Sequence, residues 1–186
     1  MNRLLKILVL SIFAAFLAAG SAGAITFTDT TTFTKNGISS DDQLNGYGWG
    51  DVNKLDGFLD YVSWTHLFEF DTPTPHVLSG TLTLALRDDG GLCDSWELGL
   101  GWAEDGTWGF GEVDTASYSY NINASFLSDG SFSVFLGSLW GDFYIDKSDL
   151  KITYDSAPVP EPATMLLFGV GLIGIAGFGR KKLIKK

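Results

Sequence analysis

The chain is poor in the residues that most catalytic and metal sites use. Its 186 residues include one cysteine, Cys93, and two histidines, His66 and His76. A single cysteine excludes an intrachain disulfide, and so few nitrogen and sulfur ligands exclude a structural zinc site. A reactive thiol would also need a neighbouring base that the sequence does not identify, so we expect Cys93 to be a small buried residue.

The motifs of several enzyme classes are also missing. There is no G-x-S-x-G elbow, no H-E-x-x-H, no phosphate-binding loop and no G-x-G-x-x-G that opens a helix. His66 falls in an apolar strand pattern and is expected in the core, whereas His76 is expected in an exposed turn. We therefore expect no enzymatic activity. The alternative is a glycan hydrolase, which needs only two carboxylates about 5–10 Å apart.

Basic residues are scarce between residues 25 and 157. This segment has five of them against 21 acidic residues, a formal charge of −16. Such a field repels phosphate backbones and anionic lipid headgroups, which excludes nucleic acid as a partner. It attracts divalent cations, although solubility outside the cell explains the acidity better than any one metal site does.

The first 24 residues have the three parts of a signal peptide. Arg3 and Lys6 form a positive start, an apolar run follows from Ile7 to Leu17, and small residues end it at Ala22-Gly23-Ala24. The apolar run is too short for a transmembrane helix. We expect delivery to the export translocon and cleavage by signal peptidase after Ala24.

The C-terminal end has the pattern of a single membrane-spanning helix. Residues 163–179 carry no charge and would form a helix of roughly 25 Å, close to the minimum for a bilayer core of about 30 Å. The tail at 180–186 is basic, and Arg180, Lys181 and Lys182 are expected to hold the C-terminus in the cytoplasm.

A short proline motif precedes this predicted helix. Pro160 and Pro162 restrict the backbone, so that Glu161 is displayed on an extended, accessible segment. Pro-Glu-Pro, an apolar helix rich in glycine and leucine, and a terminal basic cluster resemble the PEP-CTERM sorting signal over residues 159–182. This signal is also called the ice-binding protein C-terminal domain.

The resemblance implies recognition by an exosortase, a membrane-embedded cysteine protease or transpeptidase. It also implies cleavage near Pro160–Pro162 and release or re-anchoring of the protein at the surface of a bacterium that makes exopolysaccharide. A plain C-terminal membrane anchor after a proline-containing linker is the alternative.

Residues 25–155 are predicted to form an all-β domain, joined to the tail by a linker at 156–160. Eight or nine short alternating segments are separated by turns such as Asp105-Gly106 and Asp129-Gly130, which is typical of an antiparallel β-sandwich of jelly-roll type. The alternation also assigns tryptophans to the core. The predicted inward positions include Trp64, Trp96, Leu98, Leu100, Trp102 and Trp140.

Two places in this domain could bind a ligand. Asp88, Asp89 and Asp94 surround a Gly-Gly turn and could supply the oxygens that calcium prefers, although aspartate is common in turns without any metal. Tyr47 and Trp49 lie among glycines in a predicted loop and could present flat rings to a sugar. Burial of Trp49 is an equal alternative.

These patterns together predict an exported surface or matrix protein that exosortase processes and that acts in adhesion or exopolysaccharide binding. A surface glycan hydrolase and an inert component of an extracellular layer are the two alternatives.

Overall fold

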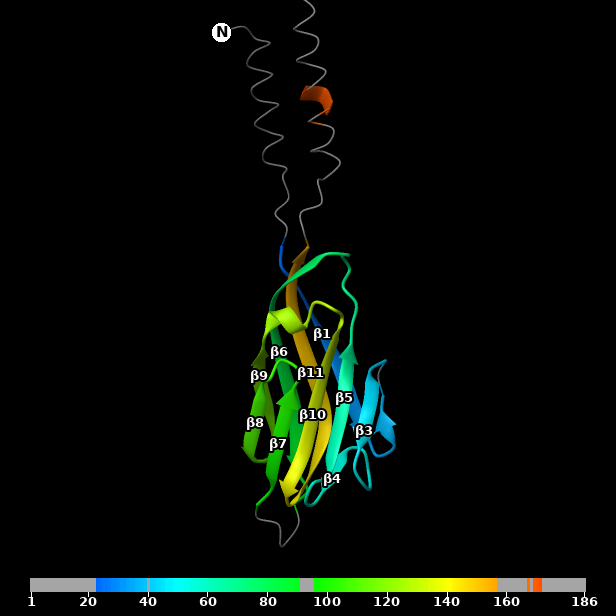
Figure 1. Ribbon diagram of the computed structural model, residues 1–186, viewed down its shortest axis with the longest axis vertical. Coiled ribbons are helices and arrows are strands. Elements are labelled where there is room, and N and C mark those ends of the chain that lie inside the picture. The colour runs from blue at the N-terminus through cyan, green and yellow to red at the C-terminus, as the bar shows by residue number, and fades with distance from the viewer. Residues whose placement is uncertain (1–22, 40, 91–95, 157–166, 168, 172–186) are drawn as a thin grey trace, which may run out of the picture. The chain divides into compact units, whose positions relative to one another are not determined.

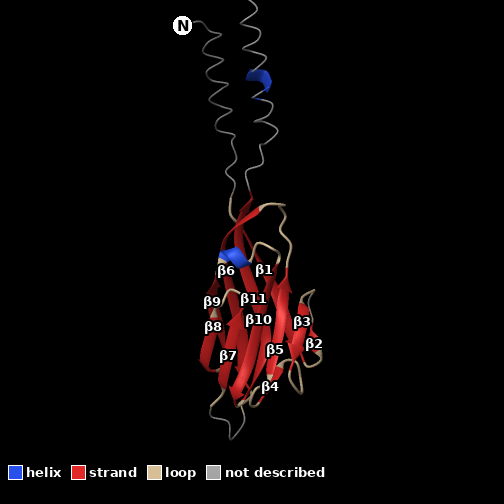
Figure 2. Ribbon diagram, in the orientation of Figure 1, coloured by secondary structure: helices blue, strands red, loops and turns tan. Residues whose placement is uncertain are grey.

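A computed structural model describes residues 23–39, 41–90, 96–156, 167 and 169–171 of the chain. Between Ile25 and Ser156 the chain forms two packed β-sheets (Figure 1). Figure 2 shows that strands make up most of this region and that a single short helical turn, Ala124–Phe126, interrupts them in the described part of the domain. The predicted all-β antiparallel sandwich is confirmed.

The first sheet has six strands and the second has five. In spatial order the first sheet contains β2 (Gly37–Ile38), β1 (Ile25–Thr34), β11 (Asp142–Ser156), β6 (Pro75–Asp88) and β9 (Ala116–Ile122), with β4 (Lys54–Asp56) also paired to β11. The order in the second sheet is β3 (Gln43–Tyr47), β5 (Tyr61–Leu67), β10 (Ser131–Trp140), β7 (Leu98–Ala103) and β8 (Trp108–Glu112).

The core lies between the two sheets and follows from alternation along most of each strand. Buried side chains at alternate positions over most of β6, β10 and β11 pack against one another between the sheets. The alternation is interrupted on β10, where Leu136, Gly137 and Ser138 are all buried. Trp64 and His66 on β5 are fully buried, as the alternation predicted. The core residues from these four strands include Val62, Leu82, Leu84, Leu86, Phe132, Val134, Leu136, Leu150 and Ile152.

The predicted facing of β7 is wrong, because its large side chains point away from the core. Trp102 is 60% exposed, whereas Gly99 and Ala103 face inward. Trp96 and Trp140 are also exposed rather than buried. On β10, Trp140 follows a register shift after Ser138. On the β7–β8 hairpin the reason is steric. A Cβ added at Gly99 would lie 2.8 Å from Val113 Cγ2, and one at Gly109 of β8 only 2.6 Å from Tyr120 Oη.

Two smaller expectations also need correction. Alternation along β6 places Leu78 on the same face as Leu82, Leu84 and Leu86, but Leu78 is exposed. His76 is exposed as expected, yet it lies within β6 rather than in a turn.

Several sequence predictions fall largely outside the described residues. These are Ala22 and the rest of the signal peptide, Cys93, Asp94, the motif Pro160, Glu161 and Pro162, most of the predicted span 163–179, and Arg180, Lys181 and Lys182. Ala24 is described and lies just before β1. Within the described part of the chain, no helix has the length and apolar character needed to cross a bilayer.

Candidate ligand-binding face

The outer side of the second sheet carries a row of aromatic side chains. Phe135 on β10 pairs with Trp102 on β7, and Trp102 pairs with Trp108 on β8. Neighbouring strands lie about 4.8 Å apart, so the three rings sit on three successive strands. Trp108 is 66% exposed and Phe135 is partly exposed. Directly opposed residues share one side of a sheet, so these rings form a continuous surface.

A second row runs beside the first, two residues along each strand. Tyr61, Gly137, Leu100 and Phe110 are paired across β5, β10, β7 and β8. The ring of Phe135 lies over Gly137, where an added Cβ would be 3.1 Å from Phe135 Cε1. This position lets Phe135 stack on Tyr61 with ring centroids 5.5 Å apart and planes 17° from parallel.

We call these two rows the aromatic face. It comprises Tyr61, Leu100, Trp102, Trp108, Phe110 and Phe135.

Polar side chains form a further row on the same side of the sheet, which we call the polar row. Asn45 Nδ2 donates to Thr65 Oγ1 at 2.7 Å, and Thr65 Oγ1 lies 3.0 Å from Ser133 Oγ. The Ser133 N–H donates to Glu104 Oε2 at 2.9 Å. A carboxylate offers about four acceptor positions, and this bond uses one, so Glu104 retains capacity for a ligand hydroxyl.

A shallow groove of about 240 Å³ lies where the two kinds of row meet. Trp102 and Phe135 line its apolar side, and Asn45, Ser133 and Glu104 line its polar side. Binding sites for small polar molecules commonly combine apolar surface with a few placed hydrogen-bonding groups. The groove can therefore hold a ligand that has both an apolar face and hydroxyl groups.

The hairpin between β7 and β8 sets the direction of the exposed rings. Both strands alternate large residues with glycine, and the pairs Gly99–Gly111 and Gly101–Gly109 lie together on the inner side. Asp105 fixes the turn, because its carboxylate accepts hydrogen bonds from the Thr107 N–H at 2.9 Å and the Asn123 N–H at 2.8 Å. A fixed turn fixes the register, and the register decides which side carries every large residue.

The two aromatic residues predicted from sequence lie elsewhere on this sheet. Tyr47 ends β3, Trp49 follows it, and both are about half exposed. Trp49 is held in place, since its Nε1–H donates to the Asp56 carbonyl at 3.1 Å and its backbone N–H to Asp60 Oδ1 at 3.1 Å. Neither residue lines the groove.

Sequence reasoning missed Trp102, Trp108 and Phe110. The alternation of large residues with glycine on both strands of one hairpin places these three residues on one side, but it does not tell which side faces the core.

The two described residues of the predicted calcium group are engaged by protein groups. Asp88 Oδ1 accepts a hydrogen bond from the Gly90 N–H at 2.9 Å, as expected of a turn. Asp89 lies 3.6 Å from the Lys54 ammonium, which also contacts Asp142 and Asp56. The hydrogen bond to Asp142 raises the pKa of Lys54 above its ordinary value. A lysine thus supplies the positive charge among these carboxylates.

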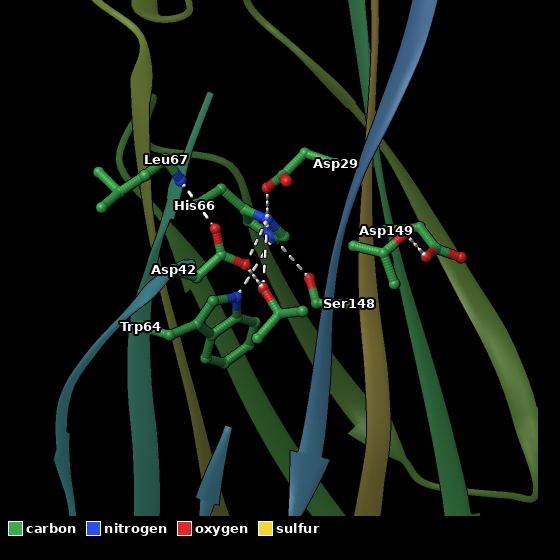
Figure 3. A network of polar contacts seen from close by, with 9 residues as sticks. Asp29, Asp42, Trp64, His66, Leu67, Ser148 and Asp149 are labelled. Carbon is green, nitrogen blue, oxygen red and sulfur yellow. Dashed lines mark hydrogen bonds and ion pairs between the residues drawn. The ribbon is translucent and has the colours of Figure 1, made fainter. Parts of the chain in front are cut away.

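A buried network around His66 is a second place where chemistry could be sought (Figure 3). His66 Nδ1 lies 2.7 Å from Asp29 Oδ2, and its Nε2 lies 2.9 Å from Ser148 Oγ. This order of serine, histidine and aspartate resembles a catalytic triad. However, Ser148 and His66 are both fully buried, so no substrate can reach the hydroxyl.

The same network does not suit a metal ion either. Asp29, Asp42 and His66 offer ligand atoms within 4.8 Å of one another. Trp64 Nε1, which can only donate, lies 3.2 Å from His66 Nε2, so Nε2 accepts and the ring proton belongs on Nδ1 facing Asp29. A metal bound to Nδ1 would require the ring proton to sit on Nε2. Two hydrogen-bond donors, His66 Nε2–H and Trp64 Nε1–H, would then face each other. The network therefore links β1, β5 and β11 structurally.

Comparison with known proteins identifies the C-terminal segment. Residues 158–181 match the model of the PEP-CTERM protein-sorting motif. No curated protein matches the chain.

The β-sandwich is similar to several solved structures at low identity. A CBM35 from Cellvibrio japonicus Abf62 is 16% identical, with 69% of this chain and 92% of that chain covered and a TM-score of 0.36. A family two carbohydrate esterase from Cellvibrio japonicus is 16% identical, with 73% and 37% covered and a TM-score of 0.39. A GH26-CBM35 β-(1,4)-mannanase from Podospora anserina is 16% identical, with 76% and 29% covered and a TM-score of 0.32. TM-scores this low do not assign a ligand.

Proposed function

We propose that this PEP-CTERM protein binds a glycan of the extracellular matrix through its aromatic face and the adjoining groove, and that it catalyses no reaction. The PEP-CTERM motif implies export, membrane attachment before processing by exosortase, and delivery to the surface. The observation that carries the proposal is the exposed cross-strand row Phe135, Trp102 and Trp108.

Because these side chains are exposed, the fold lacks the stabilisation that their burial would provide. Burial of one large apolar side chain contributes about 1.5–3 kcal/mol, and soluble monomers rarely expose contiguous apolar patches of several hundred Å² without a binding role. Here the inward positions of the same hairpin are filled by four glycines and Ala103. Large apolar residues outside and glycine inside reverse the usual pattern and lower stability, which supports a functional role for this surface.

The neighbouring polar row supports a glycan rather than a second copy of the chain. A sugar ring presents C–H groups to an aromatic ring and hydroxyls to the side, which suits Trp102 beside Glu104 and Ser133. Self-association through this face would cover the exposed Glu104 of both copies, and the strands of this sheet carry no lysine or arginine that could pair with it.

The residues that line the groove also help to weigh the alternative that the protein is a glycan hydrolase. Glycoside hydrolysis requires two carboxyl groups about 5–10 Å apart across the bond that breaks. Among the described residues that line the groove, Glu104 is the single carboxylate. Binding without turnover is therefore the function that these groups support best.

A binding assay on the full chain, purified in detergent micelles, tests this proposal. Affinity electrophoresis through a panel of polysaccharides should reveal at least one that retards the protein. Trp102→Ala and Trp108→Ala should each weaken that binding about tenfold or more, because central aromatic residues often contribute 2 kcal/mol or more to binding.

Trp49→Ala is the matched control, since Trp49 is exposed to a similar extent outside the groove. Equal loss in all three variants, or no retardation by any polysaccharide, would contradict the proposal. Sedimentation at several protein concentrations separately tests self-association through the aromatic face.

A further inference from the structure

The two sheets differ in how they carry positive charge. The five strands β3, β5, β10, β7 and β8, all within the described residues, contain no lysine or arginine. The basic residues of the domain lie on the first sheet or on the turn after β1. They are Lys35, Lys54, Arg87, Lys147 and Lys151.

Most of these cations form ion pairs with neighbouring carboxylates. Lys35 pairs with Asp51 at 3.3 Å, Arg87 with Asp146 at 3.4 Å, and Lys147 with Asp149 at 2.6 Å. Each of these three cations therefore has an acidic partner close by. They offer nothing to a ligand on the outer side of the second sheet.

Acidic groups, in contrast, border the aromatic face. Glu104 ends the polar row and is exposed beside Trp102. Glu112 on β8 lies two residues beyond Phe110, on the same side of the strand, and is also exposed. The face thus has negative charge at its border and no positive side chain on its strands.

This distribution narrows the class of glycan. We propose that the aromatic face selects glycans without anionic groups, either neutral or amino-bearing, and rejects polymers of uronic acid or sulfated sugar. The inference rests on the proposed function, because it concerns the ligand of the same face. A carboxylate or sulfate on a bound sugar would approach Glu104 or Glu112 with no cation on these strands to compensate.

Matched polymers that share a backbone test this inference directly. Hydroxyethyl cellulose is compared with carboxymethyl cellulose, dextran with dextran sulfate, and guar with carboxymethyl guar, using the full chain in a non-ionic detergent. Chitosan oligosaccharides add an amino-bearing arm. For any backbone that binds, the uncharged member should bind at least about tenfold more tightly at low ionic strength.

Added salt and variants without the two carboxylates then test whether charge repulsion causes this preference. The preference should shrink in 1 M NaCl, where screening extends only about 3 Å. It should also shrink in Glu104→Gln/Glu112→Gln, because glutamine at 104 can still accept from the Ser133 N–H. A preference unaffected by both changes, or tighter binding of the anionic member, would overturn the inference.

The outcomes separate this inference from the proposal on which it rests. Binding that is lost in Trp102→Ala but favours the anionic polymer would contradict the charge selection alone. Binding that survives in both Trp102→Ala and Trp108→Ala would instead contradict the assignment of the aromatic face as the site.

Discussion

Trp102 and Trp108 lie directly opposite each other across β7 and β8, with more than half of each side chain exposed. Their Cβ atoms are expected about 4.5–5.5 Å apart, so the two indoles make one surface. Glycines at the alternate positions of both strands form the other side of this hairpin. The exposed rings and the inner glycines are therefore two consequences of a single register.

Glycine should be required for full stability at the inner positions of this hairpin that the first sheet approaches closely. Gly109→Ala places a Cβ 2.6 Å from Tyr120 Oη and 3.0 Å from its ring, so we expect a loss of about 1–3 kcal/mol in unfolding free energy. Gly111→Ala, two residues along the strand, meets no atom within 4 Å and should change stability by less than about 0.5 kcal/mol. Urea denaturation measures both, and equal midpoints would contradict the close contact.

The two histidines should differ sharply in their effect on stability. His66→Leu removes the partner of the Trp64 N–H and of Asp29, so the unfolding free energy should fall by at least about 2 kcal/mol. His76→Leu removes only an exposed contact with Asp155 and should change it by less than about 1 kcal/mol. Similar thermal midpoints for the two variants would show that the buried network contributes little.

Asp60 should hold the loop that carries Trp49. Its buried carboxylate accepts hydrogen bonds from the backbone N–H groups of Asp56 at 2.7 Å, Tyr61 at 2.9 Å and Trp49 at 3.1 Å. Asp60→Ala leaves these donors without this partner and should cost at least about 2 kcal/mol. The exposed Asp41→Ala is the control. Chemical denaturation checks the values, and equal stability of both variants would refute the role.

Alkaline pH should weaken the fold partly through Lys54. Its hydrogen bond to Asp142 raises its pKa above 10.5 in the folded state, so its stabilisation is present below that pH and is lost as pH rises through the folded pKa. Lys54→Met should therefore lose stability less steeply above pH 10.5 than Lys151→Met, whose lysine is exposed.

Burial of Tyr120 raises its pKa too and gives a slope of the same sign in both variants, so it cancels in the comparison. Parallel profiles of unfolding free energy against pH would exclude the Lys54 contribution.

Much of the sandwich was predictable because alternation in most strands opposes apolar residues to polar ones. On β5 and β10 this contrast correctly assigns Trp64, Phe132 and Val134 to the core. On β7 neither side of the strand is polar. Alternation alone therefore does not tell whether Leu100 and Trp102 or the glycines face the core. The deciding contacts come from Val113 and Tyr120, which follow later in the chain. The aromatic face could therefore not be located from local sequence.

The register of the first and last strands has a mechanical consequence. Ile25 pairs with Tyr154, and β11 lies between β1 and β6 with a partner on each side. The tail continues from β11, so tension applied there pulls along a strand flanked on both sides. Such a load shears many ladder bonds at once instead of peeling them singly. If the protein were held at this end while its other sheet bound a polymer, the force would load the ladders of β11 in shear.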